Sequence, residues 1–479
     1  MMLRYIGKTL LRKKWISNSG NEFGCWRLLR KKNLASVSSP TRSSTPIEMA
    51  AKDGELRVFI VSGEVSGDSI ASRTMASLKK LSPFPVHFSG VGGPMMSNQG
   101  LQSLFPIEDI AVMGIWELLP HLNKIRVKLK ETTEAAMLFR PHVVLTVDSK
   151  GFSFRLLKQL RARNSKTKLN GPVHFHYVAP SFWAWKGGEE RLRGLAEFVD
   201  HILCILPNED EVCRSNGLAA TFVGHPTLED VFELNMRNNS SLHEWKIEGK
   251  GEDFRSEYEV PSGATIITLL PGSRIQEVTR MLPIFAKAIG QLRDKFPELI
   301  VVIHVAPNRN VENFIADAAN KWPVPVILIP GGSPCLKYDA FSASRVALCT
   351  SGTVAIELQL ARLPCIVAYR AHFLTEWFIR YKAKIKYISL PNILLDSAVI
   401  PEALFEGCTP TMLASLLKEL ILDDRCREEQ FVAAEKVFKL LCPSERTMSN
   451  LPQPNLRSMS PDYIPSVIAA STILNYRKP

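Results

Sequence analysis

The chain has 479 residues, which is enough for two domains that each bury a complete hydrophobic core. Its 46% hydrophobic and 22% charged residues are ordinary for a globular protein. The formal net charge of +12 comes mostly from the first 47 residues, which hold ten Lys or Arg and one Glu. The rest of the chain is nearly neutral and has no basic stripe, so no nucleic-acid partner is expected.

Residues 1–50 form a leader that is rich in Lys, Arg and Ser and lacks the continuous apolar stretch of a secretory signal. This composition is typical of an organelle transit peptide. It predicts a location in the mitochondrion, with the plastid as the alternative. A disordered basic tail would have the same composition.

The nine cysteines include no Cys-x-x-Cys pair, and several lie in apolar runs such as "ALCT" and "PCIVAY". They predict buried free thiols rather than a disulfide framework or a zinc site. No run of about 18 apolar residues occurs, so the sequence predicts no membrane-spanning helix.

Short runs rich in β-branched residues alternate with helical stretches in two blocks. The first block, 53–230, contains "LRVFIVS", "VHFSG", "HVVLTVD", "VHFHYVA" and "HILCIL"; the second, 263–410, contains "ATIITLL", "ELIVVIHV", "VPVILI", "RVALCT" and "PCIVAY". This alternation predicts an α/β protein with two doubly wound parallel sheets, whose ligands bind at the carboxyl ends of the strands in a cleft between the domains. A polar linker is expected at 231–262, helices at 411–442 and a loose tail at 443–479.

The loop "SGEVSGD", Ser62–Asp68, lies between the first strand and a helix. Its glycines stand four residues apart, so it is not a dinucleotide fingerprint, and it also fails as a P-loop or a nucleophile elbow. It offers backbone amides, the hydroxyls of Ser62 and Ser66, and the carboxylates of Glu64 and Asp68 to the cleft. A binding role and a simple turn with a helix cap explain this loop equally well.

The segment 111–130, "AVMGIWELLPHLNKIRVKLK", joins an apolar loop to a helix. Leu122, Ile125 and Leu129 fall on one helical face and are interleaved with Lys and Arg. A basic amphipathic helix of this kind lies on an anionic membrane surface, accepts lipid chains, or simply packs on its own sheet.

Asp148 stands at the carboxyl end of the run "HVVLTVD", where a carboxylate can take a proton from an attacking hydroxyl. It would act alone or together with Glu64 or Asp68. The alternative is an N-cap for the helix that begins near Gly151. The aromatic run "HYVAPSFWAW" after the next strand predicts either a sugar or acyl pocket or core filling.

"LLPGSRIQEV" leads from a strand through Ser273 into Arg274, where a helix begins. Helix amides and a guanidinium suit a diphosphate; the alternative is a surface Arg that caps a loop. Further on, Ser351-Gly352-Thr353 opens another helix, and Glu357 lies one turn into it. Nucleotide-sugar transferases of the two-Rossmann class use this arrangement to hold a phosphate and the ribose hydroxyls, although such a Glu can also be an ordinary solvated charge.

The chain contains no Asp-x-Asp and no cluster of His, Cys and carboxylates at metal-ligand spacing. No metal or other cofactor is therefore expected. Charge on a leaving diphosphate would have to be met by Arg274 and by helix amides.

Together these stretches resemble the lipid-A-disaccharide synthases, which are glycosyltransferases of the two-Rossmann (GT-B) architecture. The resemblance covers about residues 56–440. It rests on segments that occur in the family's order: "SGEVSGD", "GVGGPMM", "AVMGIWELLP", "HYVAPSFWAW", "FVGHP", "LLPGSR", "SGTVAIE" and "YISLPNILL".

The resemblance implies an inverting transfer at a membrane surface, without a metal. In this reaction 2,3-diacylglucosamine moves from UDP-2,3-diacylglucosamine to the 6-hydroxyl of 2,3-diacylglucosamine 1-phosphate, which gives a β-1,6 disaccharide 1-phosphate and UDP. A homodimer is a candidate assembly.

Carried over residue by residue, Asp148 looks like the catalytic base, Arg274 like the phosphate-binding Arg and Glu357 like the ribose ligand. Asn392, in "SLPN", looks like a further donor-site residue. The apolar loop around residues 112–119 looks like the lipid-facing patch, with these candidates: Met113, Ile115, Trp116, Leu118 and Leu119.

The chain departs from the family's pattern on the acceptor side. Where the family has Asp-x-Pro-x-Phe-Asn, this chain has "DSKGFS", in which Lys150 follows Ser149. Lys186 replaces the Arg after the second Trp, and Asn208 replaces a common aromatic. Acyl preference and rate are therefore in doubt. Two alternatives stay open: a GT-B enzyme acting on unacylated UDP-GlcNAc, and a UDP- or lipid-binding homologue with impaired catalysis.

Overall fold

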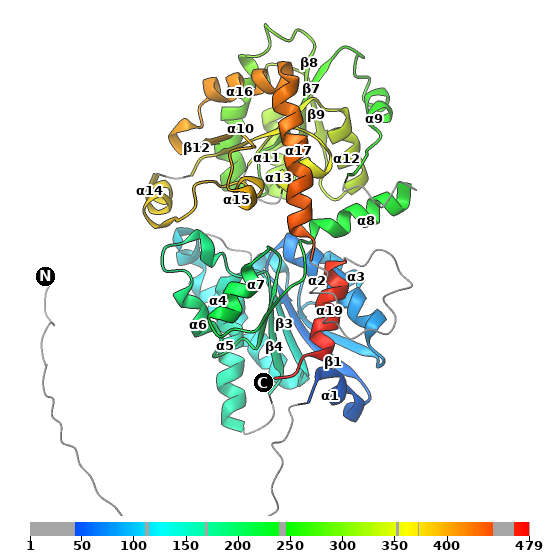
Figure 1. Ribbon diagram of the computed structural model, residues 1–479, viewed down its shortest axis with the longest axis vertical. Coiled ribbons are helices and arrows are strands. Elements are labelled where there is room, and N and C mark those ends of the chain that lie inside the picture. Colours follow the sequence, from blue (N-terminus) through cyan, green and yellow to red (C-terminus); the bar gives the residue numbers. More distant parts are fainter. Residues whose placement is uncertain are drawn as a thin grey trace, which may run out of the picture. The chain divides into compact units, whose positions relative to one another are not determined.

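The computed structural model describes residues 44–110, 115–167, 171–238, 246–350, 354–371, 373–443 and 464–478. Two parallel six-stranded sheets organise residues 56–222 and 265–404, in the strand orders β2-β1-β3-β4-β5-β6 and β12-β11-β10-β7-β8-β9 (Figure 1). The strands of the first sheet are β1 (Leu56–Ser62), β2 (Val86–Val91), β3 (Val143–Val147), β4 (Val173–Tyr177), β5 (His201–Cys204) and β6 (Ala220–Phe222). The strands of the second sheet are β7 (Thr265–Leu270), β8 (Leu299–His304), β9 (Val326–Ile329), β10 (Val346–Cys349), β11 (Cys365–Tyr369) and β12 (Glu402–Leu404).

Helices connect successive strands, as parallel pairing requires. Around the first sheet they are α1 (Pro46–Asp53), α2 (Val65–Leu81), α3 (Pro94–Asn98), α4 (Ile115–Phe139), α5 (Lys150–Thr167), α6 (Glu190–Leu195) and α7 (Glu209–Ser215), with short 3₁₀ turns η1 (Ile107–Asp109) and η2 (Phe182–Ala184). Around the second they are α10 (Ile275–Gly290), α11 (Arg309–Ala319), α12 (Pro334–Ala343), α13 (Val354–Leu360), α14 (Phe373–Lys382), α15 (Leu390–Leu395), η3 (Phe405–Gly407), α16 (Pro410–Leu422) and α17 (Asp424–Leu441). The expected α/β architecture is confirmed.

Both faces of each sheet are covered, which explains why the strands are apolar runs rather than alternating ones. Phe59 and Val61 of β1 contribute to one buried cluster, and Val58 and Ile60 contribute to another. Because successive strand residues point to opposite faces, these two clusters are the two layers beside the first sheet.

The expectation of a loose tail over 443–479 is wrong for its last part. Helix α19 (Pro465–Asn475) buries Ile468 and Ile473 against α1 and α2, beside the first sheet (Figure 1). The Oγ atoms of Ser77 and Ser466 are 2.9 Å apart, and the amide of Ser466 donates to the carboxylate of Glu229 at 2.6 Å. The apolar pattern "SVIAASTIL" was not recognised as a helix because it follows a Pro/Ser-rich stretch, which is typical of a loose tail.

Two other expected boundaries also shift. Helix α1 lies partly inside the expected leader 1–50, because Thr45 and Glu48 form a capping box that starts the helix at Pro46. The expected linker 231–262 contains the end of α8 (Thr227–Asn238) and all of α9 (Gly251–Glu257).

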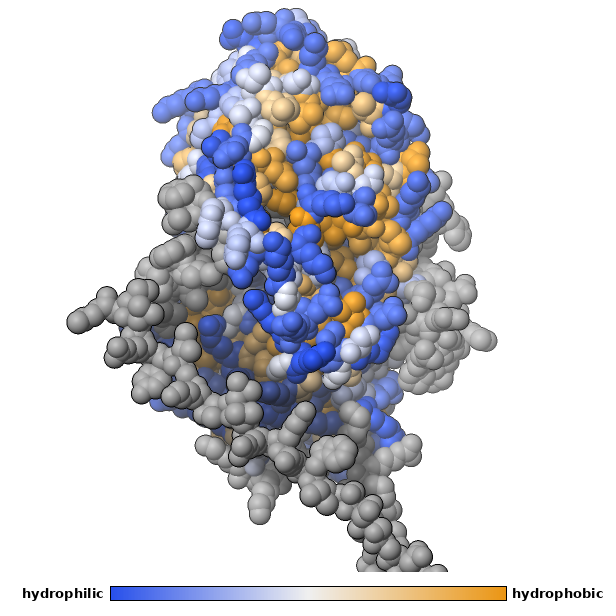
Figure 2. Space-filling view, turned by 60° about the vertical axis from the view of Figure 1, so that its left-hand side comes forward, coloured by the Kyte–Doolittle hydropathy of each residue, from blue (hydrophilic) through white to orange (hydrophobic). Residues whose placement is uncertain are grey.

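The surface combines charged and apolar areas. On the face drawn in Figure 2, hydrophobic residues gather over the upper part of the view, the part built on the second sheet in Figure 1. None of the helices in the described ranges is both long enough and apolar enough to cross a bilayer.

Candidate active site

The loop after β1 is a tight turn that leads directly into α2. The buried Ser62 hydroxyl donates to the carbonyl of Glu64 at 3.1 Å and fixes this turn. Gly67 must be glycine there, because a Cβ would come within 2.5 Å of the Ser62 Oγ. Ser66, in the first turn of α2, is exposed. Glu64 and the start of α2 are therefore accessible on this loop, while the Ser62 hydrogen bond fixes the conformation of the turn.

Asp68 joins the two glycine-containing loops of the first domain. Its carboxylate, in a side chain that is 2% exposed, accepts the amides of Gly93, Met95 and Met96 at 2.8, 2.9 and 3.2 Å. These are donors at the start of α3 that have no partner within the helix. Asp68 thus positions the loop "GVGGPMM" and is engaged with backbone rather than open to the cleft.

Asp148 sits at the carboxyl end of β3 in a strained backbone conformation. Asp148 and Ser149 have backbone φ angles of +50° and +45°. Residues other than glycine adopt such angles rarely and at some energetic cost. The turn is held by the Asp148 amide, which donates to Tyr177 O at 3.0 Å, and by Ser153 Oγ, which donates to Asp148 O at 2.8 Å. Gly63 allows the close approach of the neighbouring loop, since a Cβ there would lie 2.5 Å from the Ser149 Cβ.

Glu64 connects Asp148 with Arg274. The Arg274 Nη2 lies 3.2 Å from the Glu64 Oε2, across the two halves of the chain. Burial, and then the negative charge of Asp148, raise the pKa of Glu64 above its usual range, while Arg274 and Lys150 act in the opposite direction. The structure therefore brings together the Glu64 carboxylate and the Arg274 guanidinium, which lie in the loops after β1 and β7.

The loop that carries Ser273 and Arg274 is shaped by a buried carboxylate. Gly272 has a φ of +115°, and a Cβ at that position would lie 2.2 Å from the Glu277 Oε2. Glu277 accepts hydrogen bonds from the Ser273 amide and the Thr350 hydroxyl, and its burial raises its pKa. Ser273 and Arg274 themselves are exposed and precede α10 directly. This arrangement suits recognition of an anion by a helix start and a guanidinium.

The second expected phosphate loop, Ser351-Gly352-Thr353, lies outside the described residues. Glu357, in the first turn of α13, forms an ion pair with Lys337 of α12, with Nζ and Oε2 3.0 Å apart. Both side chains are about one-fifth exposed. In the described part of the chain, no group of three or more His, Cys, Asp or Glu side chains is arranged to hold a metal ion.

Asn392 is fully buried in α15 and organises the chain that follows it. Its Nδ2 donates to Ile400 O at 2.7 Å and to the Glu402 carboxylate at 2.9 Å, and its Oδ1 accepts the amides of Val399 and Ile400 at 3.0 and 2.8 Å. These four bonds use the capacity of the carboxamide. The side chain therefore positions this loop rather than presenting a free group to a ligand.

Lys150 and Glu209 were not anticipated as site residues, whereas Trp183 belongs to the aromatic run for which a sugar or acyl pocket was one of two expectations. Lys150 is largely buried, its Nζ lies 3.3 Å from the Ser181 Oγ, and burial lowers its pKa against the opposing charges of Asp148, Glu209 and Glu64. The Trp183 Nε1 donates to Glu209 at 2.9 Å, and burial raises the pKa of Glu209 to about 7. The only sequence signal was the departure from the family's pattern at Lys150 and Asn208, the neighbour of Glu209.

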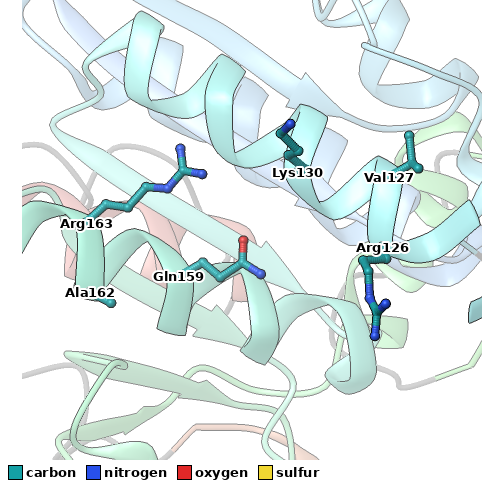
Figure 3. Close-up of a pocket in the computed structure, with 6 residues that line it drawn as sticks. All are labelled: Arg126, Val127, Lys130, Gln159, Ala162 and Arg163. Carbon is teal, nitrogen blue, oxygen red and sulfur yellow. The ribbon is translucent and has the colours of Figure 1, made fainter. Parts of the chain in front are cut away.

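The expected lipid-facing patch is described only in part. Met113 lies outside the described residues, and Ile115, Trp116, Leu118 and Leu119 belong to the first turns of α4, where only the backbone is described. Further along the helix, a groove of about 540 Å³ opens between α4 and α5. Figure 3 shows the side chains that line it: Arg126, Val127, Lys130, Gln159, Ala162 and Arg163.

Comparisons with solved structures identify the fold. A UDP-GlcNAc 2-epimerase from Neisseria meningitidis bound to UDP-GlcNAc superposes with a TM-score of 0.53 at 13% identity, over 80% of this chain and 99% of that chain. The S. aureus MnaA–UDP complex superposes with a TM-score of 0.52 at 12% identity, over 80% and 94%. At this identity the likeness concerns the fold alone, and it confirms the GT-B class.

Comparisons with protein sequences identify the family. The probable mitochondrial lipid-A-disaccharide synthase of Arabidopsis thaliana is 63% identical over 443 residues, which are 92% of this chain and 95% of that protein. The lipid-A-disaccharide synthase of Rhodospirillum centenum is 40% identical over 81% of this chain and 90% of that protein. A family model described as lipid-A-disaccharide synthetase matches residues 58–452. The chain belongs to the lipid-A-disaccharide synthase family of glycosyltransferases.

Proposed function

We propose that the protein transfers 2,3-diacylglucosamine from UDP to the 6-hydroxyl of 2,3-diacylglucosamine 1-phosphate, with inversion, giving the β-1,6 disaccharide 1-phosphate and UDP. The observation that carries this proposal is the ion pair between Glu64 and Arg274, formed where the charge of Asp148 raises the pKa of Glu64. A base and a diphosphate-binding cation then stand on two sides of one site, as an inverting sugar transfer requires.

Asp148 acts as the general base in this proposal. Its carboxylate takes the proton of the acceptor 6-hydroxyl while the hydroxyl oxygen attacks the anomeric carbon of the donor. The new C–O bond forms as the bond between the anomeric carbon and the diphosphate oxygen breaks, and UDP leaves with the electron pair. The strained turn at Asp148 and Ser149 follows β3 directly and places Asp148 at the carboxyl end of that strand.

Arg274 and Ser273 meet the diphosphate at the start of α10. A guanidinium binds two phosphate oxygens at once, and the helix amides add donors directed at the same charge. Glu64 holds Arg274 in the absence of substrate, so the diphosphate must replace this carboxylate as the partner of Arg274. Ser351, Gly352 and Thr353 are proposed to hold the same phosphates, and Glu357 the ribose.

We further propose that the protein works at the surface of a mitochondrial membrane. The Arabidopsis relative is named mitochondrial. The α4–α5 groove carries Arg126, Lys130 and Arg163 around Val127, whose side chain is exposed, and this combination suits anionic headgroups (Figure 3). The lipid-facing patch of residues 112–119 would lie against the acyl chains.

The test uses the purified chain from Ser44 onward with UDP-diacylglucosamine and the monosaccharide 1-phosphate acceptor in mixed micelles. The expected products are equimolar UDP and a lipid with the mass of the disaccharide 1-phosphate. An Asp148→Ala protein serves as the control. UDP release no faster than in this control would refute the transfer, and equal turnover of unacylated UDP-GlcNAc would favour the alternative substrate.

A further inference from the structure

We propose that a small basic pocket between the two halves of the chain binds the phosphate of the acceptor lipid. Its volume is about 140 Å³, and it is lined by Trp185, Lys186, Arg191 and Lys382. The first three residues follow η2 in the first half, and Lys382 ends α14 in the second. The inference rests on the proposed function, because it assigns one part of that acceptor to a place in the protein.

Main-chain hydrogen bonds fix the two walls of this pocket against each other. The amide of Lys186 donates to Lys382 O at 3.0 Å, and the amide of Lys384 donates to Ala184 O at 2.9 Å. Between these bonds, Trp185 and Ala383 form an antiparallel bridge. The pocket is therefore a built feature of the seam between the halves and does not depend on flexible side chains alone.

Three cations converge on this pocket without a neutralising acid. The ammonium groups of Lys186 and Lys382 lie 5.9 and 5.4 Å from the centre of the Tyr381 ring, and the Lys186 Nζ donates to Tyr381 O at 3.0 Å. In the described ranges, no carboxylate lies within ion-pair distance of Lys186, Arg191 or Lys382. Like charges held together repel, and a phosphate offsets this repulsion while accepting several charge-assisted hydrogen bonds.

One loop connects the pocket with the neighbourhood of Asp148. The loop begins at Ser181, whose hydroxyl accepts a hydrogen bond from Lys150, the residue two positions after Asp148. It continues through Trp183, which binds Glu209, and reaches the pocket at Trp185 and Lys186. An acceptor with its reactive hydroxyl at Asp148 and a phosphate on the far side of its sugar ring fits this layout.

The experiment compares two charge-removing variants, Lys186→Gln and Lys382→Gln, with a matched control, Lys384→Gln. Lys384 lies in the same segment and its Nζ is 3.7 Å from Glu189, but it does not line the pocket. Calorimetry with a short-chain diacylglucosamine 1-phosphate should show about tenfold weaker binding for each pocket variant and none of this loss for the control. Lys186→Arg, which keeps the cation, should restore most of the affinity.

Two further arms identify the source of the phosphate. An acceptor analogue without the 1-phosphate should bind wild-type and variant proteins equally. Vesicles containing phosphatidylglycerol should also bind all of them equally. Unchanged affinity of both pocket variants for the phosphorylated acceptor would overturn the inference. It would also be overturned if the pocket variants bound only the vesicles more weakly than the wild type does. Because these are binding measurements, they stand even if the protein transfers no sugar.

Discussion

Glu64 interacts electrostatically with both Arg274 and Asp148. It neutralises Arg274 in the absence of a ligand and is itself made harder to ionise by burial and by Asp148. In the proposed function, a diphosphate that arrives at Arg274 takes over this pairing and releases Glu64 from it.

Replacing Arg274 with Lys should weaken UDP binding about tenfold, because an ammonium cannot form the two parallel bonds of a guanidinium. Calorimetric titration with UDP measures this directly. Arg280→Lys, a change of the same kind farther along α10, should leave the affinity unchanged. If Arg274→Lys binds UDP as tightly as the wild type, Arg274 does not contact the diphosphate.

Asp148→Asn should lower kcat by at least about 100-fold, because the carboxamide cannot accept the proton of the acceptor hydroxyl. UDP affinity should stay within a factor of two, since Asp148 lies in the half of the chain that is proposed to receive the acceptor. Single-turnover kinetics combined with UDP titration separate these two effects. If the variant loses kcat and UDP affinity to a similar extent, Asp148 has a structural role at the turn.

The sequence correctly places Asp148 directly after one strand and Arg274 in the loop after another, because each strand is a continuous apolar run. Lys150 and Glu209 were not predictable as site residues. Their place in the site depends on partners distant in the sequence, Ser181 and Trp183, which lie at the 3₁₀ turn after β4. Asp68 and Asn392 match family motifs, but the structure shows that both bind other parts of the protein. Asp68 accepts a hydrogen bond from the Gly93 amide, and Asn392 donates to Ile400 O and to the Glu402 carboxylate.

At the scale of elements, helix α19 links distant parts of the chain. It packs on α1 and α2 of the first sheet, and its second residue is held by Glu229 of α8. The sequence predicted β1–β5 and β7–β11, because buried parallel strands are continuous apolar runs, but it did not predict the short edge strands β6 and β12. It missed this helix because an isolated apolar segment after a Pro/Ser-rich stretch gives no sign of what covers it.

Ile473→Ala should lower the free energy of unfolding by about 2–4 kcal/mol, since the side chain is fully buried and its loss leaves a cavity. Asn475→Ala, at an exposed position of the same helix, should cost less than about 1 kcal/mol. Urea denaturation followed by circular dichroism measures both. Equal stability of the two variants would mean that α19 is not docked on the first sheet.

At the scale of the whole molecule, buried histidines dominate the response to acid. Burial lowers the pKa of five of them to about 3 or about 4: His174, His176, His201, His225 and His304. Their usual pKa is about 6.5, so between pH 6.5 and 4 the unfolded chain binds protons that the folded chain does not. Burial raises the pKa of Glu209 and Glu229 to about 7, which acts in the opposite direction but involves fewer groups.

The free energy of unfolding should therefore fall on acidification from pH 7 to pH 5, on the order of several kcal/mol. Urea denaturation at a series of pH values tests this, and His225→Gln should reduce the slope, because desolvation is the cause of its shift. A stability that is constant or rises over this interval would show that the histidines are not buried as neutral groups.

The central claim is that the ends of two parallel sheets enclose one sugar-diphosphate site, with Arg274 on one wall and Asp148 on the other. A crystal structure of the protein with UDP and a non-hydrolysable donor analogue tests it most directly. The account predicts that the diphosphate contacts the Arg274 guanidinium and the Ser273 loop in place of Glu64, with the anomeric carbon turned toward Asp148. A diphosphate bound away from Arg274, or an Asp148 carboxylate that points away from the sugar, would contradict it.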